Sequence, residues 1–212
     1  MERPTGCGYI PGMTRAAVAL ALSLLAAPSA AAQKPAPAAG PPLAGFAALQ
    51  VSVFPAQLWR ADTTAWSRGV TWAAVRAAFD STLQATLEER GLGRKWAYAS
   101  DVVRIAKRNP TYASDPYALG VVRLRAPAEL KAGDPIPTVL GDNLRPFTAL
   151  GDTRYALIPI EVRAQGAEVV LRLVLVDTRS RTLTWGGELL APGGPRMAEA
   201  LAQRVADLII EP

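Results

Sequence analysis

The stretch RYALIPIEVRAQGAEVVLRLVLVDTRSRTLTWGGEL, residues 154–189, decides which fold this chain can adopt. It contains three runs rich in branched aliphatic residues, separated by AQGA (164–167) and TRSR (178–181). Runs of this composition favour strands, and connections this short join neighbouring antiparallel strands as hairpins. The stretch therefore predicts a three-stranded antiparallel meander.

Alternation along a strand assigns its side chains to the two faces of the sheet. The second run has a wholly apolar face and an opposite face that carries Arg172; the apolar face consists of Leu171, Leu173 and Leu175. In the first run four aliphatic residues are expected to share a face: Ala156, Ile158, Ile160 and Val162.

The corner VDTRSRTLTW, residues 176–185, is interpreted as a bend and not as a binding site. Asp177 is expected to accept a hydrogen bond from its own backbone two residues on, as Asp does in many turns. Leu183 and Trp185 are then expected to return to the interior together, with Trp185 buried between the sheet and a helix.

The chain before the meander alternates strand and helix patterns. VSVF (51–54) is typical of a strand that ends at Pro55. A helix capped by Thr71 and ended by Gly91 follows. Its apolar residues recur at three- and four-residue spacing, and its polar ones lie opposite. The apolar set is Trp72, Val75, Phe79, Leu83 and Leu87, and the polar set is Arg76, Asp80, Gln84 and Glu88.

Further along, the elements become shorter. KWAYAS (95–100) predicts a short strand, and Ser100–Asp101 open a second helix that Asn109–Pro110 stop. Asp115 and Pro116 resemble the first two positions of another short helix. Residues 109–142 are expected to form a long loop, with a proline-rich part at 126–142.

After Gly193–Gly194–Pro195 a terminal amphipathic helix is expected. Its apolar stripe consists of Met197, Leu201, Val205 and Leu208. The predicted fold is therefore α/β (α+β): a single mixed sheet with a C-terminal three-stranded meander and helices packed on the sheet.

The first residues of the sequence are typical of a secretory signal. An arginine precedes an apolar run from Ala16 to Ala27, and Ala30 and Ala32 fit the small-residue rule for cleavage after Ala32. The apolar run is shorter than the ~20 residues that a membrane span needs. We expect residues 1–32 to be a signal peptide, with Met13 an alternative start, and no transmembrane span after cleavage. Retention of the segment as an anchor is the alternative.

The next segment, QKPAPAAGPPLAG (33–45), is typical of an extended leader, so the folded domain is expected to cover residues 46–212.

Cysteine and histidine usage restricts the chemistry. The sequence has one cysteine, Cys7, and no histidine. Cys7 precedes the apolar run, so its position does not match a lipidation site, and cleavage would remove it. The remaining chain has no thiolate nucleophile, no Ser-His-Asp relay and no Cys/His zinc site. We therefore expect no metal and no cofactor, and catalysis only through carboxylates or lysines.

The net charge of +5 does not indicate nucleic-acid binding. Basic residues occur in pairs such as Arg94–Lys95 and Lys107–Arg108, and not in a long run with interleaved aromatic residues. A solvated surface explains these pairs.

The pattern RYALIPIEV, a turn, VVLRLVLVDTRSRTLTW and a terminal helix resembles a group of bacterial envelope domains. The group includes the TolB amino-terminal domain, the periplasmic domain of the curli secretion channel and lipoprotein activators of penicillin-binding proteins. VSVFPAQ resembles their first strand, and LQATLEERGLGRKWAYAS their first helix and second strand. The resemblance covers residues 47–210. It implies the fold and a role in envelope assembly through protein binding, and it assigns no functional residue.

Two functions follow from these observations. The first is a non-enzymatic periplasmic or secreted module, associated with the envelope and its outer membrane, that binds an envelope protein. Its anchors would be aromatic residues of the loops: Trp59, Trp66, Tyr112 and Tyr117. The alternative is a carboxylate-dependent cell-wall glycan hydrolase, with candidate carboxylates at Asp115, Asp134 and Asp142. The oligomeric state and the partner's identity are left open.

Overall fold

Strand β4 (Tyr155–Gln165) runs through the middle of the sheet and pairs along both of its edges. The computed structural model describes residues 40–60, 71–124 and 130–211, all of which belong to one unit, residues 39–212. The other strands are β1 (Val51–Val53), β2 (Leu58–Trp59), β3 (Trp96–Ala97), β5 (Glu168–Asp177) and β6 (Thr182–Pro192). The helices are α1 (Trp72–Glu89), α2 (Ala99–Arg108), α3 (Thr138–Leu150) and α4 (Met197–Asp207), with short 3-10 turns at Ala44–Phe46 and Val121–Leu124.

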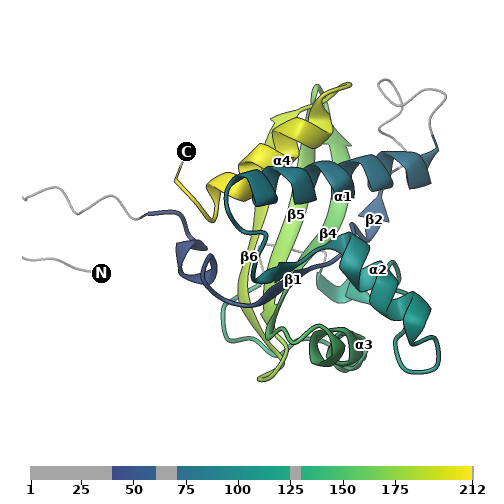
Figure 1. Cartoon of the computed structure of the whole chain (residues 1–212). Coiled ribbons are helices and arrows are strands. Elements are labelled where there is room, and N and C mark those ends of the chain that lie inside the picture. Colours follow the sequence, from purple (N-terminus) through teal and green to yellow (C-terminus); the bar gives the residue numbers. More distant parts are fainter. Residues whose placement is uncertain (1–39, 61–70, 125–129, 212) are drawn as a thin grey trace, which may run out of the picture. The chain divides into compact units, whose positions relative to one another are not determined.

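The strand order is β3-β1-β4-β5-β6, and β2 pairs with the same edge of β4 as β1. Strands β1 and β2 pair parallel to β4, and β3 pairs parallel to β1. Strands β4, β5 and β6 form an antiparallel meander. The predicted mixed sheet with a C-terminal meander is confirmed (Figure 1).

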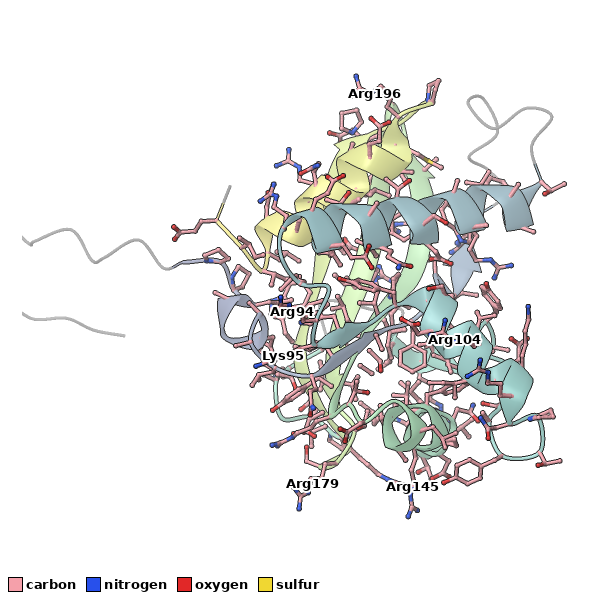
Figure 2. All side chains as sticks on the ribbon, viewed as in Figure 1. Arg94, Lys95, Arg104, Arg145, Arg179 and Arg196 are labelled. Atoms are coloured by element: carbon pink, nitrogen blue, oxygen red, sulfur yellow. The ribbon has the colours of Figure 1, made fainter. Side chains whose placement is uncertain are left out.

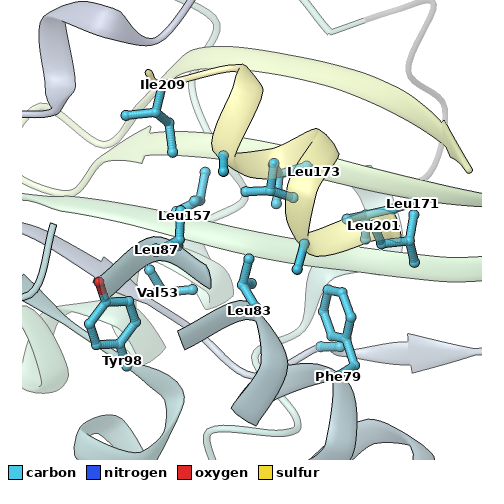
Figure 3. Packing of buried hydrophobic residues seen from close by; sticks show 14 of the residues in the cluster. Val53, Phe79, Leu83, Leu87, Tyr98, Leu157, Leu171, Leu173, Leu201 and Ile209 are labelled. Atoms are coloured by element: carbon cyan, nitrogen blue, oxygen red, sulfur yellow. The ribbon is translucent and has the colours of Figure 1, made fainter. Parts of the chain in front are cut away.

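Helices α1 and α4 cover one face of the sheet, and α3 lies against the other (Figure 1). The α1/α4 core contains the apolar face predicted for β5 together with the buried stripes of both helices. Figure 3 shows its centre, with Phe79, Leu83, Leu87, Leu157, Leu171, Leu173, Leu201 and Ile209. Burial of the apolar side chains of this core is a large favourable contribution to folding, because it removes apolar surface from water.

The α3 core fills the opposite face. Phe147 of α3 meets Phe54, next to β1, edge to face, with ring centroids 5.5 Å apart. The remaining large members are Val102 of α2 and Leu119, Leu140, Leu144, Ile158 and Ile160. Because both faces are covered, β4 and β5 are apolar on both sides over most of their length.

Helix α1 begins and ends as its sequence predicts. The Thr71 hydroxyl accepts a hydrogen bond from the N–H of Ala74. At the other end Gly91 has φ +90°, and the N–H of Leu92 donates to the carbonyl of Leu87. This 6→1 bond satisfies a carbonyl that the helix leaves without a partner.

The predictions between residues 109 and 142 are partly wrong. Asp115–Pro116 begin a turn and not a helix, because the carbonyl of Asp115 accepts directly from the N–H of Ala118. The proline-rich loop ends early, since α3 starts at Thr138. Helix α3 buries Leu140, Leu144 and Phe147 at three- and four-residue spacing. This spacing is typical of a helix, but the internal Pro146 argues against one in the sequence.

A β-bulge in β4 changes which residues share a face. Pairing with β5 shifts between Pro159 and Glu161, which leaves Ile160 as the extra residue. After such a bulge the side chains change face, so Val162 lies in the α1/α4 core and not beside Ile160. The predicted common face is right for Ala156, Ile158 and Ile160 and wrong for Val162.

A second bulge, in β6, corrects the prediction for the corner. The turn itself is confirmed, since the Asp177 carboxylate accepts from the N–H groups of Arg179 and Ser180. Pairing then skips Thr184, so Leu183 enters the α3 core while Trp185 faces the α1/α4 core. Trp185 is only half-buried and packs across Gly187, where an added Cβ would lie 2.7 Å from its ring.

One buried side chain connects the sheet to the segment after α2. The side-chain nitrogen of Gln57 donates to the carbonyls of Pro55 (2.8 Å) and Pro116 (2.9 Å). Its side-chain oxygen accepts from the N–H of Leu119 at 3.0 Å. Gln57 is 6% exposed, so these three bonds satisfy groups that water does not reach.

Replacing Gln57 with Ala should lower the free energy of unfolding by about 3 kcal/mol or more, because each buried group left without a partner costs about 1–3 kcal/mol. Urea denaturation would measure the loss. Gln165→Ala, at an exposed strand end, is the matched control and should change stability by less than ~0.5 kcal/mol. Equal stabilities of the two variants would contradict the role given to Gln57.

Candidate functional site

A groove runs along α2, between this helix and the segment 110–117. Its wider part has a volume of about 340 Å³ and a largely apolar wall. The lining residues are Val103, Ala106, Lys107, Pro110, Ala113, Ser114, Asp115, Pro116 and Tyr117. Small side chains and two prolines leave this hollow open, because none of them is long enough to fill it.

A narrower hollow of about 160 Å³ continues from the first toward α1. The two share Val103 and Tyr117, so they form one continuous depression, here called the α2 groove. The narrow part is more polar. It is lined further by Ala77, Asp80, Ser81, Gln84, Ala99 and Ser100.

Tyr117 stands at the junction of the two parts and is held there from three sides. The N–H of Tyr117 donates to the carboxylate of Asp115 at 2.9 Å. The Arg76 guanidinium lies over its ring, 4.5 Å from the centroid. Gln57 fixes the carbonyl of the preceding Pro116. Burial, together with the nearby charge of Asp80, raises the pKa of the Tyr117 hydroxyl, which therefore remains a hydrogen-bond donor at neutral pH.

The other predicted anchors lie in different surroundings. Tyr112 is 56% exposed on the turn that follows α2, between groove residues Pro110 and Ala113. Trp59 stacks on Trp72 with centroids 6.2 Å apart and does not line the groove. Trp66 lies outside the described residues. The structure thus brings Tyr112 and Tyr117 to one region and places Trp59 elsewhere.

Asp80 also lines the groove, although the sequence does not indicate it as a site residue. The alternation of α1 assigns it to the polar face, yet α2 and the strand connection at 54–57 enclose that part of the helix. One carboxyl oxygen accepts from the N–H of Ala56 at 3.2 Å, and the other is buried without a partner among the described residues. Burial raises the pKa of Asp80 to about 7, against the opposing effects of the Ala56 hydrogen bond and the Arg76 charge.

Ser114 adds a second unsatisfied polar atom. Its hydroxyl oxygen is buried and has no hydrogen-bond partner in the described part of the chain. Buried polar groups are nearly always paired, so this hydroxyl is an exception in the groove wall. An apolar trough with a few polar groups at fixed places is the usual composition of a binding site.

The three carboxylates proposed for hydrolysis each make a local contact instead. Asp115 accepts from Tyr117 in its turn, Asp134 accepts from the N–H of Lys131, and Asp142 pairs with Arg181 at 2.9 Å. Of these three only Asp115 lines the α2 groove, where the other carboxyl group among the described residues is that of Asp80 in the narrow part. Glycoside hydrolysis needs two carboxyl groups facing each other across a cleft. Asp115, Asp134 and Asp142 do not form such a pair, because each makes a separate local contact.

Residues 40–60, 71–124 and 130–211 hold no group of three or more acidic residues placed to bind a metal ion. Their helices also lack an apolar stretch long enough for a membrane crossing.

No family model matches the sequence. A search of curated proteins finds no match either.

Solved structures do resemble the chain. The LpoB C-terminal domain from Salmonella enterica has 12% identity and a TM-score of 0.42, covering 68% of this chain and 83% of its own. A PelC dodecamer structure from Paraburkholderia phytofirmans has 14% identity and a TM-score of 0.41, covering 81% and 96%. A lipoprotein from Neisseria meningitidis has 18% identity and a TM-score of 0.38, covering 74% and 96%.

LpoB is one of the envelope proteins that the sequence pattern resembles. At these identities and TM-scores the likeness says nothing of what this chain binds.

The Asp80 carboxyl should make stability depend on pH. The folded state keeps it protonated up to about pH 7, whereas an unfolded chain releases the proton near the ordinary pKa of 3.8. Folding therefore takes up a proton between these values, and stability should fall as pH rises from 5 to 8. The loss is on the order of 2 kcal/mol or more, since one unit of pKa corresponds to about 1.4 kcal/mol.

Asp80→Asn keeps an oxygen for Ala56 and cannot ionise, so it should remove this part of the pH dependence. Urea unfolding at pH 5 and pH 8 measures the difference. Asp115→Asn, at an exposed carboxylate, is the control and should retain the wild-type dependence. The same slope in Asp80→Asn as in the wild type would contradict the assignment.

Proposed function

We propose that this protein is a non-enzymatic module of the bacterial cell envelope that binds another envelope protein through the α2 groove. The observation that carries the proposal is the groove itself: an apolar trough beside the exposed Tyr112, with Tyr117 at its narrowing. The signal pattern of residues 13–32 supports a periplasmic or secreted location.

The composition of the groove indicates the kind of partner. Its length and its small apolar lining suit an extended segment of a protein that inserts one or two apolar side chains. Tyrosines lose little conformational entropy on binding, so Tyr112 and Tyr117 can contribute much of the binding energy.

Replacing Tyr112 and Tyr117 together with Ala should weaken partner binding by about tenfold or more, as expected for two aromatic anchors. Stability should change little, because Tyr112 is exposed and loss of the Arg76 contact of Tyr117 costs about 1 kcal/mol. The measurement is recovery of a stoichiometric partner from envelope extract with the tagged protein, together with a thermal melt of each variant.

Two further variants sharpen this test. Ala106→Glu places a charged side chain in the trough and should also block the partner. Leu190→Ala removes an exposed apolar side chain from β6, outside the groove, and should leave binding unchanged. Full recovery of the partner by the tyrosine double variant and by Ala106→Glu would refute the groove as the binding site.

A further inference from the structure

A second hollow, of about 490 Å³, opens where three connections meet at one end of the sheet. The last turns of α3 supply Arg145 and Thr148, the α3–β4 connection supplies Asp152 and Thr153, and the β5–β6 turn supplies Thr178, Arg179 and Arg181. Figure 2 shows Arg145 and Arg179 projecting from this end of the molecule, with Arg196 at the opposite end. None of these residues lines the α2 groove.

The charge of the hollow is not balanced by the protein. Among the described residues Arg145 and Arg179 have no acidic partner, whereas Arg181 pairs with Asp142 at 2.9 Å. An adjoining hollow of about 220 Å³ shares Asp152 and Thr153 and adds Arg94 and Lys95. The two linings together contain five basic side chains and a single carboxylate, that of Asp152. Concentrating like charges in one concavity raises the local concentration of anions.

The backbone that carries each arginine is fixed before any ligand arrives. Asp177 accepts the N–H of Arg179 at 2.9 Å through one oxygen, and Arg154 donates to the other oxygen at 2.6 Å. Burial acts to raise the pKa of Asp177, but the hydrogen bonds from Arg154 and the turn prevail and lower it, so the carboxylate stays ionised. Arg145 projects from a helix whose adjacent Leu144 is fully buried.

We propose that this hollow is a binding site for a phosphate-bearing ligand, with Arg145 and Arg179 as its principal contacts. Guanidinium groups match the geometry of phosphate oxygens and can donate two parallel hydrogen bonds to them. A volume of about 490 Å³ accommodates a phosphate together with the small group that it esterifies. The phosphate belongs either to a lipid headgroup at a membrane surface or to a soluble ester. The site shares no residue with the α2 groove and stands independently of the proposed function.

Calorimetric titration of the full chain with glycerol phosphate, at low and at moderate salt, tests whether the ligand is a soluble phosphate ester. Co-sedimentation with vesicles of phosphatidylglycerol, compared with phosphatidylcholine, tests the lipid source. In at least one arm we expect binding that weakens with salt. The Arg145→Ala/Arg179→Ala double variant should lose tenfold or more of it, with an unchanged melting temperature because both side chains are exposed and unpaired.

Arg196→Ala removes an exposed arginine of the opposite end and is the matched control that should bind as the wild type does. Binding in one arm only identifies the source of the phosphate. Absence of binding in both arms, or binding that the double variant retains, overturns the proposal.

Discussion

In the middle of β4, Pro159 has no N–H group, and the buried amide of Gln57 compensates for it. In a regular parallel ladder the N–H of residue 159 would donate to the carbonyl of Pro55, because the carbonyl of Pro159 accepts from the N–H of Gln57. The side-chain nitrogen of Gln57 bonds that carbonyl instead, at 2.8 Å. The chain that pairs with this side of β4 is therefore interrupted between β1 and β2 without leaving a buried carbonyl unsatisfied.

The irregularity at Pro159 affects two other parts of the structure. The same amide holds Pro116 and Leu119, and so it attaches the wall of the α2 groove to the sheet. Next to Pro159 the bulge turns Glu161 into the interior, where it is 3% exposed and pairs with Arg60 and Arg172. A buried carboxylate is tolerated only with such partners, since removing it from water costs several kcal/mol.

The predictable parts of the fold are those governed by local periodicity. The meander, the caps of α1 and the terminal helix follow from patterns that their own residues carry. The two bulges do not, because an extra residue in one strand is defined by the register of its neighbour. For this reason the alternation of the sequence predicts the wrong face for Val162 and a common face for Leu183 and Trp185, which the bulge separates. The apolar residues of α3 recur at helical spacing, but the internal Pro146 argues against a helix in the sequence. The packing of Phe147 against Phe54, which only the structure shows, helps to stabilise this helix.

The residues of the candidate sites also differ in how far the sequence predicts them. Tyr112 and Tyr117 can be proposed from residue type, because aromatic residues in turns are unusual outside interfaces or cores. Asp80 cannot, since its position on the polar face of α1 gives no sign that α2 and the residues around Ala56 enclose it. Arg145 and Arg179 are also ordinary surface residues in the sequence. Their significance depends on a turn and a helix that are 34 residues apart meeting at one hollow.

Both candidate sites use the same local device. In each, an aspartate accepts the N–H of the residue two positions on, at 2.9 Å, and that residue presents its side chain to a hollow: Tyr117 after Asp115, and Arg179 after Asp177. The difference lies in what holds the carboxylate. Asp177 is also bonded by Arg154, which makes its turn part of the sheet, whereas Asp115 lies exposed in a segment attached through Gln57. The corner at 176–185 is thus a bend, as its sequence predicts, and the same turn places Arg179 in the lining of the second hollow, which the interpretation as a bend alone does not anticipate.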